Sequence, residues 1–398
     1  MNILVVNSGS SSIKYQLFKM PVEVPVCSGL VERIGLEQSI ITHKVFVGTD
    51  EKVWTQTITL VDHEAGLKEV ARLLTDEESG VIKNPDEISA VGHRVVHGGR
   101  AFFSTTIITQ KIKEKIKSLF QLAPLHNPAN YLGSEVAERI FTDAIQVAVF
   151  DTAFHHTMPE KAFLYAIPRS FYHDHNIRSY GFHGTSHKYV SEQAINYLNK
   201  PASKIITVHL GNGCSMAAIV NGKCIDTSMG FGPLSGLVMG TRSGDIDPSI
   251  IFHLVQQKGY KLEEVSALLN KHSGMLGITG MSDMRDIGAA HKQGNEEAAL
   301  ALDLYAYRIK KYIGAYCAAM NGLDALVFTA GVGENDAGTR ERICIDMEYL
   351  GVELDADKNN RRTNGIREIS PEHARVAVLV IPTNEELEIV KQCYELLQ

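Results

Sequence analysis

Two arginines lie in segments that also contain glycines, an arrangement that lets a guanidinium reach a ligand from an open loop. Arg94 lies in the segment GHRVVHGG and Arg242 in MGTRSGD. A guanidinium can hold a carboxylate or a phosphate through two parallel hydrogen bonds. We therefore expect both side chains to bind an anionic ligand, whereas we expect Arg100, Arg139 and Arg340 to form solvated or structural ion pairs.

Three histidines, His126, His183 and His209, each lie in a Gly- or Pro-rich turn. An imidazole in such a turn can donate a hydrogen bond to a phosphoryl oxygen, which is the function we expect for His183. His187 follows His183 at a helical spacing, and we expect it to cap or pack a helix. No H-E-x-x-H motif and no cysteine partner accompanies this pair, which disfavours a zinc site.

Two carboxylates, Asp151 and Glu385, follow apolar runs that we expect to be buried strands. Ligand-binding groups gather at the carboxyl ends of strands in open α/β sheets. A small number of hard oxygen ligands suits Mg²⁺, which keeps several waters and binds mostly through substrate phosphates. The alternative for either carboxylate is a helix cap.

The N-terminal segment from Ile3 to Phe18, ILVVNSGSSSIKYQLF, predicts two strands joined by a tight turn. Gly9 lacks a Cβ and lets a ligand approach the backbone closely. The hydroxyls of Ser10 and Ser12 can donate to anionic oxygens, and Lys14 adds a positive charge just beyond them. Such a tip suits a phosphate, although most Ser- and Gly-rich clusters between strands are ordinary turns.

The same pattern recurs half a chain later, from Ile205 to Val220, as IITVHLGNGCSMAAIV. We overlay it on the first segment without a gap, so that His209 corresponds to Asn7 and the new tip runs from Gly211 to Gly213. Self-similarity at this distance predicts two duplicated domains, each presenting a phosphate-facing hairpin to a shared cleft.

The chain has 398 residues, which is the size of two ordinary domains. Its formal net charge is -7 and no basic patch with interleaved aromatics occurs, so we expect no nucleic-acid partner. The six cysteines form no C-x-x-C motif and predict free thiols in a reducing compartment. The start MNILVV has neither a cationic segment nor an apolar run long enough for a signal or a membrane span, which predicts a cytoplasmic protein with no membrane partner.

Apolar periodicity predicts a meander of strands followed by alternating helices and strands, which indicates a mixed α/β sheet covered by helices. The expected strands lie near residues 3–6, 13–18, 26–31, 39–47, 53–60, 88–96, 145–150, in the 205–220 hairpin, just before 331, and at 376–381. The expected helices lie near residues 64–74, 112–122, up to 140, from 185, 248–257, 262–271, 296–320 and at the C-terminus. PLHNPAN (124–130) and residues 232–248 predict loops, and LVFTAGVGEN (326–335) predicts a strand ending in a Gly-rich turn.

No G-x-x-x-x-G-K-[ST] motif and no protein-kinase signature occurs in the chain. Three glycine-rich turns at strand ends therefore predict phosphate handling by another architecture. Phosphoryl transfer needs little covalent help from a protein. It requires alignment, a metal that bridges phosphate oxygens, and cations on the equatorial oxygens of the group in transit.

Ten motifs occur in the order in which the acetokinase family carries them, and the chain resembles that family from end to end. They are NSGSSSIKY, GHRVVHGG, PLHNP, FDTAFH, YGFHGTSH, HLGNG, MGTRSGDIDP, SDMRD, AGVGEN and TNEEL. The family belongs to the sugar kinase, Hsp70 and actin superfamily. The resemblance implies two duplicated α/β domains of the actin/Hsp70/hexokinase-like (ribonuclease H-like) kind, with mixed sheets flanked by helices and a cleft between them. The implied N-terminal domain covers residues 1–150 plus 384–398, and the implied C-terminal domain, with the nucleotide-binding turns, covers residues 151–383.

The resemblance also implies the roles of individual residues. Mg²⁺, with Mn²⁺ as the alternative ion, is implied at Asn7 and Glu385. ATP is implied at Lys14 with Ser10 and Ser12, at His209, Leu210, Gly211, Asn212 and Gly213, and at Asp283, Met284, Arg285, Gly331, Val332, Gly333, Glu334 and Asn335. Arg94 is implied to grip the acyl carboxylate, with Val96, Leu125, Phe182 and Pro233 around the substrate methyl and His126 beside them. His183 and Arg242 would stabilise the phosphoryl group in transit, and the family labels Asp151 as an acid/base.

The implied activity is reversible in-line transfer of the ATP γ-phosphoryl group to acetate, giving acetyl phosphate and ADP, by a homodimer. A kinase for propionate or butyrate is the alternative enzyme, because one methylene changes binding by only about 1–3 kcal/mol. A nucleotide-gated binding module of the Hsp70 or actin kind is the alternative from another class. A carboxyl nucleophile with a pKa of roughly 4.3 is already ionised at neutral pH, so we expect Asp151 to orient Arg94 or a Mg²⁺-bound water rather than to act as a base.

Overall fold

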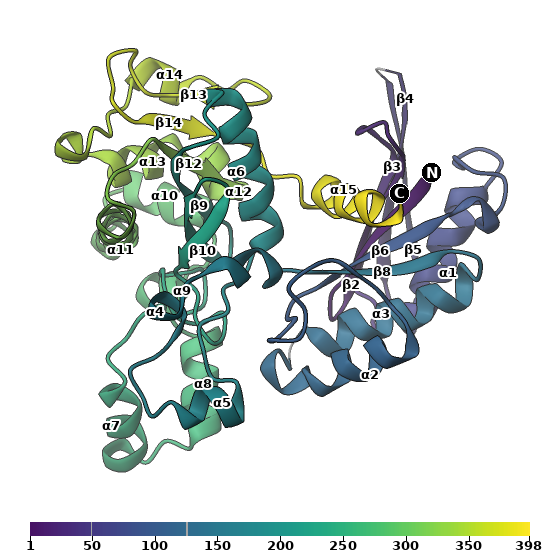
Figure 1. Ribbon diagram of the computed structural model, residues 1–398, viewed down its shortest axis with the longest axis horizontal. Coiled ribbons are helices and arrows are strands. Elements are labelled where there is room, and N and C mark those ends of the chain that lie inside the picture. The colour runs from purple at the N-terminus through teal and green to yellow at the C-terminus, as the bar shows by residue number, and fades with distance from the viewer. Residues whose placement is uncertain (49, 125) are drawn as a thin grey trace. The chain divides into compact units, whose positions relative to one another are not determined.

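The computed structural model describes residues 1–48, 50–124 and 126–398. The chain forms two compact units, one of Met1–Ala153 with Asn384–Gln398 and one of Phe154–Thr383. Each unit is built on a single mixed sheet with helices packed against it (Figure 1). Among the described residues, no helix combines the length and the apolar character that crossing a membrane requires.

The sheet of the first unit has the strand order β5-β4-β3-β2-β1-β6-β8-β7. Strands β1 to β5 form an antiparallel meander, and β6 and β8 then extend the sheet in parallel from β1. The strands are β1 (Asn2–Ser8), β2 (Ser12–Lys19), β3 (Pro25–Glu32), β4 (Ser39–Val47), β5 (Asp50–Ile58), β6 (Ala90–Val95), β7 (Thr106–Ile107) and β8 (Ile145–Phe150). The helices are α1 (His63–Thr75), α2 (Gln110–Ser118), α3 (Asn127–Ile140) and α15 (Glu385–Leu397).

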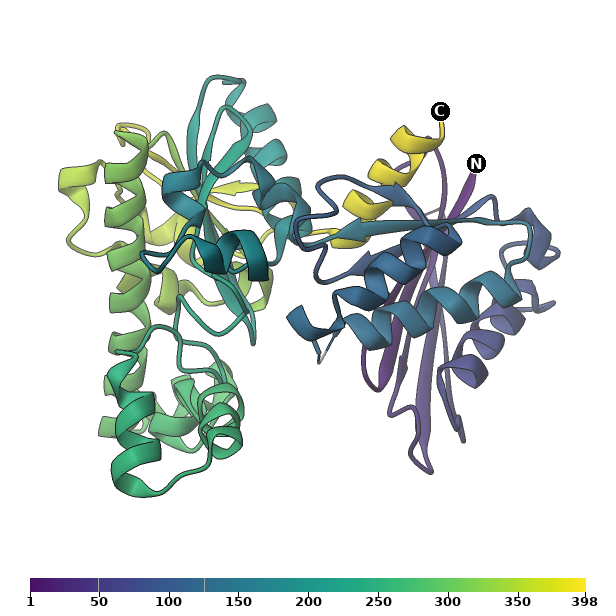
Figure 2. The same ribbon diagram turned by 60° about the horizontal axis from the view of Figure 1, so that its bottom comes forward.

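Both faces of this sheet are covered, because its central strands are apolar on both sides. Leu4 and Val6 belong to the same buried cluster as Leu67 of α1 and Val136 of α3. On the other face α15 packs so closely that a Cβ at Gly92 would lie 2.8 Å from Cys393 Sγ, which explains the glycine. Figure 2 shows α15 in yellow and α1 to α3 in blue on opposite sides of the sheet.

The sheet of the second unit has the strand order β11-β10-β9-β12-β14-β13. Its strands are β9 (Lys204–Leu210), β10 (Cys214–Val220), β11 (Lys223–Thr227), β12 (Ala325–Thr329), β13 (Arg367–Glu368) and β14 (Ala377–Val380). Its helices are α4 (Glu160–Phe163), α5 (Ser170–His175), α6 (Gly184–Leu198), α7 (Ser249–Lys258), α8 (Leu262–Lys271), α9 (Gly274–Thr279), α10 (Met284–Lys292), α11 (Glu296–Met320), α12 (Ala330–Asn335), α13 (Ala337–Cys344) and α14 (Ala356–Asn360).

The two sheets repeat one plan, which confirms the predicted duplication. The order β3-β2-β1-β6-β8 matches β11-β10-β9-β12-β14, with two antiparallel pairs followed by two parallel pairs in each. One helix in each unit also corresponds, since α15 packs on β1 and β6 and α6 packs on β9 and β12. In the chain, α15 follows β14 of the second sheet, and α6 follows β8 of the first sheet.

The gap-free overlay of the two hairpins is wrong by one residue in the second strand. The innermost pair of the first hairpin is Ser8 with Ile13, which encloses four residues. The innermost pair of the second hairpin is Leu210 with Cys214, which encloses three. The first strands therefore superpose as predicted, with Asn7 at the position of His209, but beyond the tips the correspondence shifts by one position.

Most predicted elements are present, and two segments differ from the expectation. Asn127 and Pro128 open helix α3 rather than lying in a loop, because proline fits the first turn of a helix, where its missing N–H costs nothing. The expected Gly-rich turn after β12 is a short helix, α12, which begins directly at Ala330. Residues 232–248 form an irregular loop, as predicted.

Candidate active site

In the first unit, Arg94 and Asp151 form a buried ion pair at the ends of two parallel strands. Arg94 on β6 donates from Nε to both oxygens of Asp151 at 3.1 Å and from Nη2 to Oδ2 at 2.6 Å. β6 and β8 pair with Arg94 opposite Val149, which places Asp151 just past the end of β8. The side chain of Asp151 is 2% exposed and that of Arg94 is 20% exposed. These contacts occupy the Nε/Nη2 edge of the guanidinium, whereas its Nη1/Nη2 edge has the geometry to grip a small carboxylate.

Two further carboxylates, Glu385 and Glu386, open helix α15 next to this pair. Glu385 Oε2 lies 4.0 Å from Arg94 Nε, and Glu386 forms an ion pair with Lys14 Nζ at 2.7 Å. Burial raises the pKa of the Glu385 carboxyl; Arg94 opposes this shift, and Asp151 and Glu386 add to it. Burial alone would lower the pKa of Arg94, but the charges of Asp151 and Glu385 make the net shift upward.

The donor set around Glu385 fits a magnesium ion. Three carboxylates, Asp151, Glu385 and Glu386, share two cations, and an added divalent cation would stabilise the ionised form of Glu385, whose pKa is raised by burial and further by the two neighbouring carboxylates. Within residues 1–48, 50–124 and 126–398, no three His, Cys, Asp or Glu side chains converge to hold an ion on their own. Phosphate and water oxygens would therefore complete the shell, as Mg²⁺ prefers.

The tip of the first hairpin lies next to Arg94 in the sheet. β1 and β6 pair with Val6 opposite His93, which puts Asn7 beside Arg94 at the same edge. The turn is held by a hydrogen bond from Gly9 N to Ser12 O at 2.8 Å and by His63, whose Nε2 donates to Gly9 O at 2.7 Å. The hydroxyl-bearing side chain of Ser10 is exposed and that of Ser12 is half-buried.

Of the predicted acceptor pocket, the first unit holds Val96 and His126. Val96 is buried directly after β6, and its backbone N–H donates to Asn130 Oδ1 at 3.1 Å. His126 is half-buried at the N-terminal end of α3. Leu125 lies outside the described residues.

In the second unit, His183 and His209 stack on each other. Their ring centroids are 4.3 Å apart with an interplanar angle of 20°. His183 lies in the left-handed region, with φ of 54°, at the start of α6, and His209 lies on β9. Each ring is held through Nδ1, since His183 Nδ1 lies 2.9 Å from Ser215 Oγ and His209 Nδ1 lies 2.8 Å from Ser186 Oγ.

The glycine tip of the second hairpin lies against these rings and Arg242. A Cβ built on Gly213 would lie 3.5 Å from His183 Nε2 and 3.8 Å from Arg242 Nη1. A Cβ on Gly211 would lie 3.8 Å from His209 Nε2. The carbonyl of Asn212 accepts from Gly240 N at 3.0 Å, which ties the tip to the loop that carries Arg242. Leu210 is fully buried, so its side chain cannot reach a ligand in solution.

Two predicted pocket residues, Phe182 and Pro233, are tied to this cluster through their carbonyls. Arg242 Nη1 donates to Pro233 O at 3.0 Å. His155 Nε2 donates to Phe182 O at 3.0 Å, next to His183 in the chain. Phe182 is buried and Pro233 is half-buried.

The predicted nucleoside residues begin two helices, α10 and α12. Asp283 caps α10 by accepting from Arg285 N at 2.8 Å and pairs with the Arg285 guanidinium at 2.5 Å, and Met284 opens the helix. In α12, a Cβ on Gly331 would meet no atom within 4 Å, whereas Gly333 packs against β12. Val332 and Glu334 are half-buried, and Asn335 Nδ2 donates to Gly331 O at 2.9 Å.

Arg340, which sequence reasoning placed in an ordinary ion pair, instead binds carbonyl groups in the second half of helix α12. It is 1% exposed, and its Nη1 donates to Gly333 O at 2.8 Å and to Glu334 O at 3.1 Å. Its Nε and Nη2 donate to Asn359 at 2.8 Å each, and Arg367 adds a bond to Glu334 O at 2.8 Å. Arg340 follows Gly338 at the same spacing at which Arg242 follows Gly240, so a nearby glycine could not distinguish the structural arginine from the ligand-binding candidate.

Sequence reasoning also missed the partners of the stacked imidazoles. His187, expected to cap or pack a helix, is fully buried, and its Nε2 lies 2.7 Å from the same Ser215 Oγ that binds His183. Its Nδ1 lies 2.7 Å from Thr207 Oγ1. The only available signal for Ser215 was its position two residues past the glycine tip.

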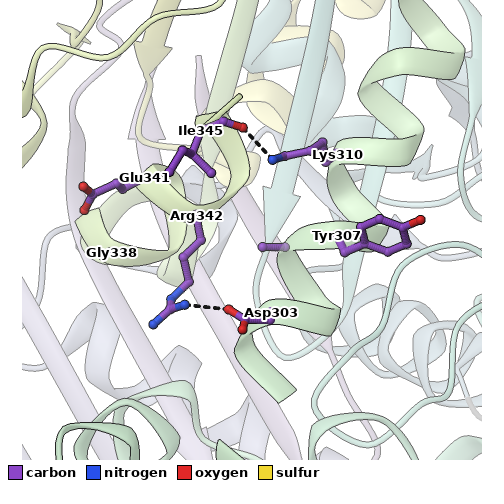
Figure 3. A pocket seen from close by; sticks show the side chains of 8 residues that line it. Asp303, Tyr307, Lys310, Gly338, Glu341, Arg342 and Ile345 are labelled. Carbon is purple, nitrogen blue, oxygen red and sulfur yellow. Dashed lines mark hydrogen bonds and ion pairs between the residues drawn. The ribbon is translucent and has the colours of Figure 1, made fainter. Parts of the chain in front are cut away.

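A separate cavity of about 560 Å³ lies between α11 and α13 (Figure 3). In it Arg342 pairs with Asp303 at 2.6 Å and Lys310 donates to the carbonyl of Ile345 at 2.5 Å. Its lining contains none of the predicted site residues, so we do not assign it to the active site.

Duplicated mixed sheets with a glycine-tipped hairpin in each, and with arginine, imidazole and carboxylate groups at the strand ends, define a two-unit α/β phosphotransferase. The acetokinase family model matches residues 2–391, and the chain belongs to that family.

Relatives and solved structures agree with this membership. The chain is 58% identical over 398 residues to the acetate kinase of Flavobacterium johnsoniae, with all of both chains covered. It is similar to the crystal structure of Porphyromonas gingivalis acetate kinase, with a TM-score of 0.93, 44% identity and all of both chains covered. It is also similar to the crystal structure of a propionate kinase from Francisella tularensis, with a TM-score of 0.90, 43% identity and 98% of each chain covered.

Proposed function

We propose that this protein is an enzyme that reversibly transfers the γ-phosphoryl group of ATP to acetate, giving acetyl phosphate and ADP. The observation that carries the proposal is the Arg94–Asp151 pair, which fixes a guanidinium while leaving one edge for a carboxylate of minimal size. Family membership over nearly the whole chain supports the same activity.

The acceptor half of the reaction belongs to the first unit in this proposal. Arg94 grips acetate through Nη1 and Nη2, and Asp151 holds the other edge so that the guanidinium cannot rotate. Val96, which is buried directly after β6 in the same unit, would shield the methyl group from water. Acetate is ionised at neutral pH, so one carboxylate oxygen attacks phosphorus directly and no base removes a proton.

The phosphate half belongs to the second unit. The backbone of Gly211, Asn212 and Gly213 approaches the phosphates, since glycine leaves no Cβ in the way. His183 and Arg242, whose side chains converge beside Gly213, donate to the equatorial oxygens as charge develops on the phosphoryl group. His209 lies beside them on β9, whereas Leu210 would contribute only its backbone.

We assign the remaining ATP contacts from the places of the residues in their helices and hairpin. Asp283, Met284 and Arg285 at the start of α10, and Gly331 to Asn335 of α12, flank the nucleoside. Lys14, Ser10 and Ser12 contribute charge and hydroxyls at the first hairpin. Asn7 and Glu385 would hold Mg²⁺, or Mn²⁺ in its place, and the ion would neutralise the phosphate charge when bound.

The phosphoryl acceptor could also be a short carboxylic acid other than acetate. Similarity to a solved propionate kinase makes propionate the second candidate acceptor. One methylene is worth only about 1–3 kcal/mol, so propionate should react about 10- to 200-fold more slowly than acetate rather than not at all. Initial rates with acetate, propionate and butyrate at equal concentration rank the three acids.

The test of the activity is acetate-dependent release of ADP, with acetyl phosphate trapped by hydroxylamine. We expect turnover that requires acetate and that falls at least about 100-fold in Arg94→Leu. The exposed Arg139→Leu, in the same unit, is the control and should keep full activity. ATP hydrolysis that ignores short acids would instead favour a nucleotide-gated binding module and overturn the proposal.

We also infer that the enzyme is a homodimer. Helix α7 carries the apolar segment SIIFHLV, yet none of its ten residues is buried. Ile250, Phe252 and Val255 are 44%, 61% and 36% exposed, and Leu262 at the start of α8 is 63% exposed. An apolar helix face of this kind is typical of a surface that another subunit covers.

We further propose that the enzyme works in the cytoplasm. The six free cysteines support a reducing compartment of this kind.

A further inference from the structure

Helix α3 packs against strands β1 and β6, the two strands that carry Asn7 and Arg94. Two asparagines of this helix, Asn127 and Asn130, lie one turn apart and are 0% and 4% exposed. Each side-chain amide bonds to the backbone of the first unit at the strand ends rather than to its own helix. These bonds explain why two polar side chains occupy the inner face of α3.

Asn130 connects the two strands. Its Oδ1 accepts from Val96 N at 3.1 Å, and its Nδ2 donates to Ser8 O at 2.8 Å. A backbone N–H can only donate and a backbone carbonyl can only accept, so one orientation of the amide satisfies both contacts. The two partners therefore fix the orientation of this side chain.

The Asn130 bridge lies beyond the point where the two strands stop pairing with each other. The pairing of β1 with β6 ends at Val6 opposite His93, whereas β6 remains paired with β8 past this point. Ser8 and Val96 both lie past the last pair, and the amide of Asn130 joins them as a further backbone pair would. The side chain thus determines how far β1 can separate from β6 at this edge of the sheet.

A third residue of α3, Gly133, shows how closely the helix approaches β1. A Cβ at this position would lie 2.6 Å from Ser8 Cβ and 2.9 Å from Ser8 Oγ. Two carbon atoms cannot approach this closely without a bond, so a side chain at this position would push α3 away from β1. Glycine is unfavourable inside a helix, and the short distance that the Asn130 bridge requires explains its presence here.

Asn127 contacts the β6 side of the edge. Its Oδ1 accepts from His97 N at 3.0 Å, and its Nδ2 donates to His97 O at 2.9 Å. Both bonds go to one residue, so this amide fixes the segment after β6 without connecting it to β1. Asn127 and Asn130 are therefore a matched pair, alike in helix, burial and number of bonds, that differ in their contact with β1.

We propose that Asn130 is a positioning residue that sets the separation of Asn7 on β1 and Arg94 on β6, the proposed ligands of the metal ion and of acetate. Asn7 directly precedes Ser8, and Arg94 lies two residues before Val96. A misplacement of about 1 Å between reacting groups costs about 100-fold in rate. The inference rests on the proposed function for the identity of the two ligands, whereas the bridge between the strands is independent of that function.

The first test compares Asn130→Ala with Asn127→Ala. Each substitution leaves two buried backbone groups without their partner, so we expect similar losses of melting temperature. Both should lower kcat/KM for acetate about 10- to 100-fold, because each residue holds the segment that follows Arg94. Asn130→Ala alone of the two should also raise the Mg²⁺ concentration that gives half-maximal rate, by at least about 5-fold, because it releases β1.

Gly133→Ala tests the same positioning role without removing a hydrogen-bonding group. The added methyl group pushes α3 away from Ser8 and stretches the Asn130 bridge, although alanine itself favours a helix. We expect a raised Mg²⁺ requirement, and this variant carries the test where Asn130→Ala does not fold. Ser134→Ala is the control, because Ser134 is a buried residue of the same helix whose hydroxyl donates to Tyr131 O; both kinetic constants should stay unchanged.

The second test does not depend on turnover. Amide hydrogen exchange, resolved by residue in NMR spectra, reports whether a backbone N–H keeps its partner. The Val96 N–H should exchange about 10-fold faster in Asn130→Ala than in the wild type. In Asn127→Ala it should exchange at the wild-type rate, and the N–H of His97 should exchange faster instead.

The outcomes separate the two proposals. Equal effects of Asn130→Ala and Asn127→Ala on the Mg²⁺ requirement, or an unchanged requirement in Gly133→Ala, would overturn the positioning role while leaving acetate phosphorylation intact. Unchanged exchange of the Val96 amide in Asn130→Ala would overturn it as well. A wild-type protein with no acetate-dependent turnover would refute the proposed function, and the exchange rates would still decide whether Asn130 bridges the strands.

Discussion

Replacing Asp151 by asparagine tests whether this carboxylate orients Arg94 or acts as a base. The amide keeps the shape of the side chain and one acceptor oxygen. In the wild type, one carboxylate serves both Nε and Nη2 of Arg94, at distances of 3.1 Å and 2.6 Å. The amide nitrogen that replaces the other oxygen cannot accept a hydrogen bond and the negative charge disappears, so at least one charge-assisted hydrogen bond is lost.

The expected loss can be worked out from that bond. A hydrogen bond to a charged group is worth about 1.5–3 kcal/mol. At about 1.4 kcal/mol for each tenfold change in rate, kcat/KM for acetate should fall about 10- to 150-fold. The variant should also bind Mg²⁺ more weakly, because the cluster that Asp151 forms with Glu385 and Glu386 loses one negative charge.

The assay is the initial rate of acetyl phosphate formation, trapped as the hydroxamate, over a grid of acetate, Mg²⁺ and pH. Asp143→Asn, an exposed aspartate of the same unit, is the control and should match the wild type. The orienting role predicts a loss of similar size at every pH and a raised Mg²⁺ requirement. A large loss at unchanged Mg²⁺ dependence that recovers as the pH rises would refute this reasoning and support a base.

Four further predictions concern α12, the acid stability of the first unit and the apolar helix. Gly331→Val should raise KM for ATP about 10-fold with an unchanged melting temperature, because its side chain meets no protein atom within 4 Å; a lowered melting temperature would show that the effect is structural. Arg340→Met should destabilise the protein by about 3 kcal/mol, measured by thermal melting, because it leaves the carbonyls of Gly333 and Glu334 without their buried donor. His93 has its pKa lowered to about 4 by burial, partly offset by Gln146. Because its folded pKa lies below its unfolded value, its contribution is fully present above about pH 6.5 and is lost as the pH falls toward 4, by about 2.5 kcal/mol at pH 4.5; His93→Gln should therefore show a smaller drop in melting temperature between pH 7.5 and 4.5 than the wild type. Phe252→Glu should shift the mass measured by light scattering from dimer to monomer while Lys258→Glu does not; a wild-type monomer would contradict the dimer.

The elements could be predicted from the sequence because their signals are local. Period-two alternation marks β2 to β5, and buried apolar runs mark β1, β8 and β9. The helix α12 could not, because two glycines within six residues disfavour a helix. Its carbonyl end is instead held by Arg340 and Arg367, which lie 6 to 33 residues further along the chain.

The functional side chains could be selected by type, but their partners could not. Arg94, Asp151, His183 and Arg242 stand out through glycine context or a strand end. Asp151 lies 57 residues from Arg94 in the chain, and no local pattern states that they pair. A serine such as Ser215 gives no signal within a strand sequence. Its hydrogen bond to His183 forms only because β10 packs against the start of α6.

The duplicated sheets explain how one ancestral plan supplies both halves of the chemistry. Pairing registers place Asn7 and Arg94 of the first sheet at the positions of His209 and Thr329 in the second. The same registers place Asp151, just past β8, at the position of Thr383, just past β14. The first sheet therefore has an amide, a cation and a carboxylate where the second has an imidazole and two threonine hydroxyls. A charged pair fixes a guanidinium for a carboxylate ligand, whereas in the second sheet the imidazole of His209 is held by a neutral hydrogen bond to Ser186, which also contacts Thr383.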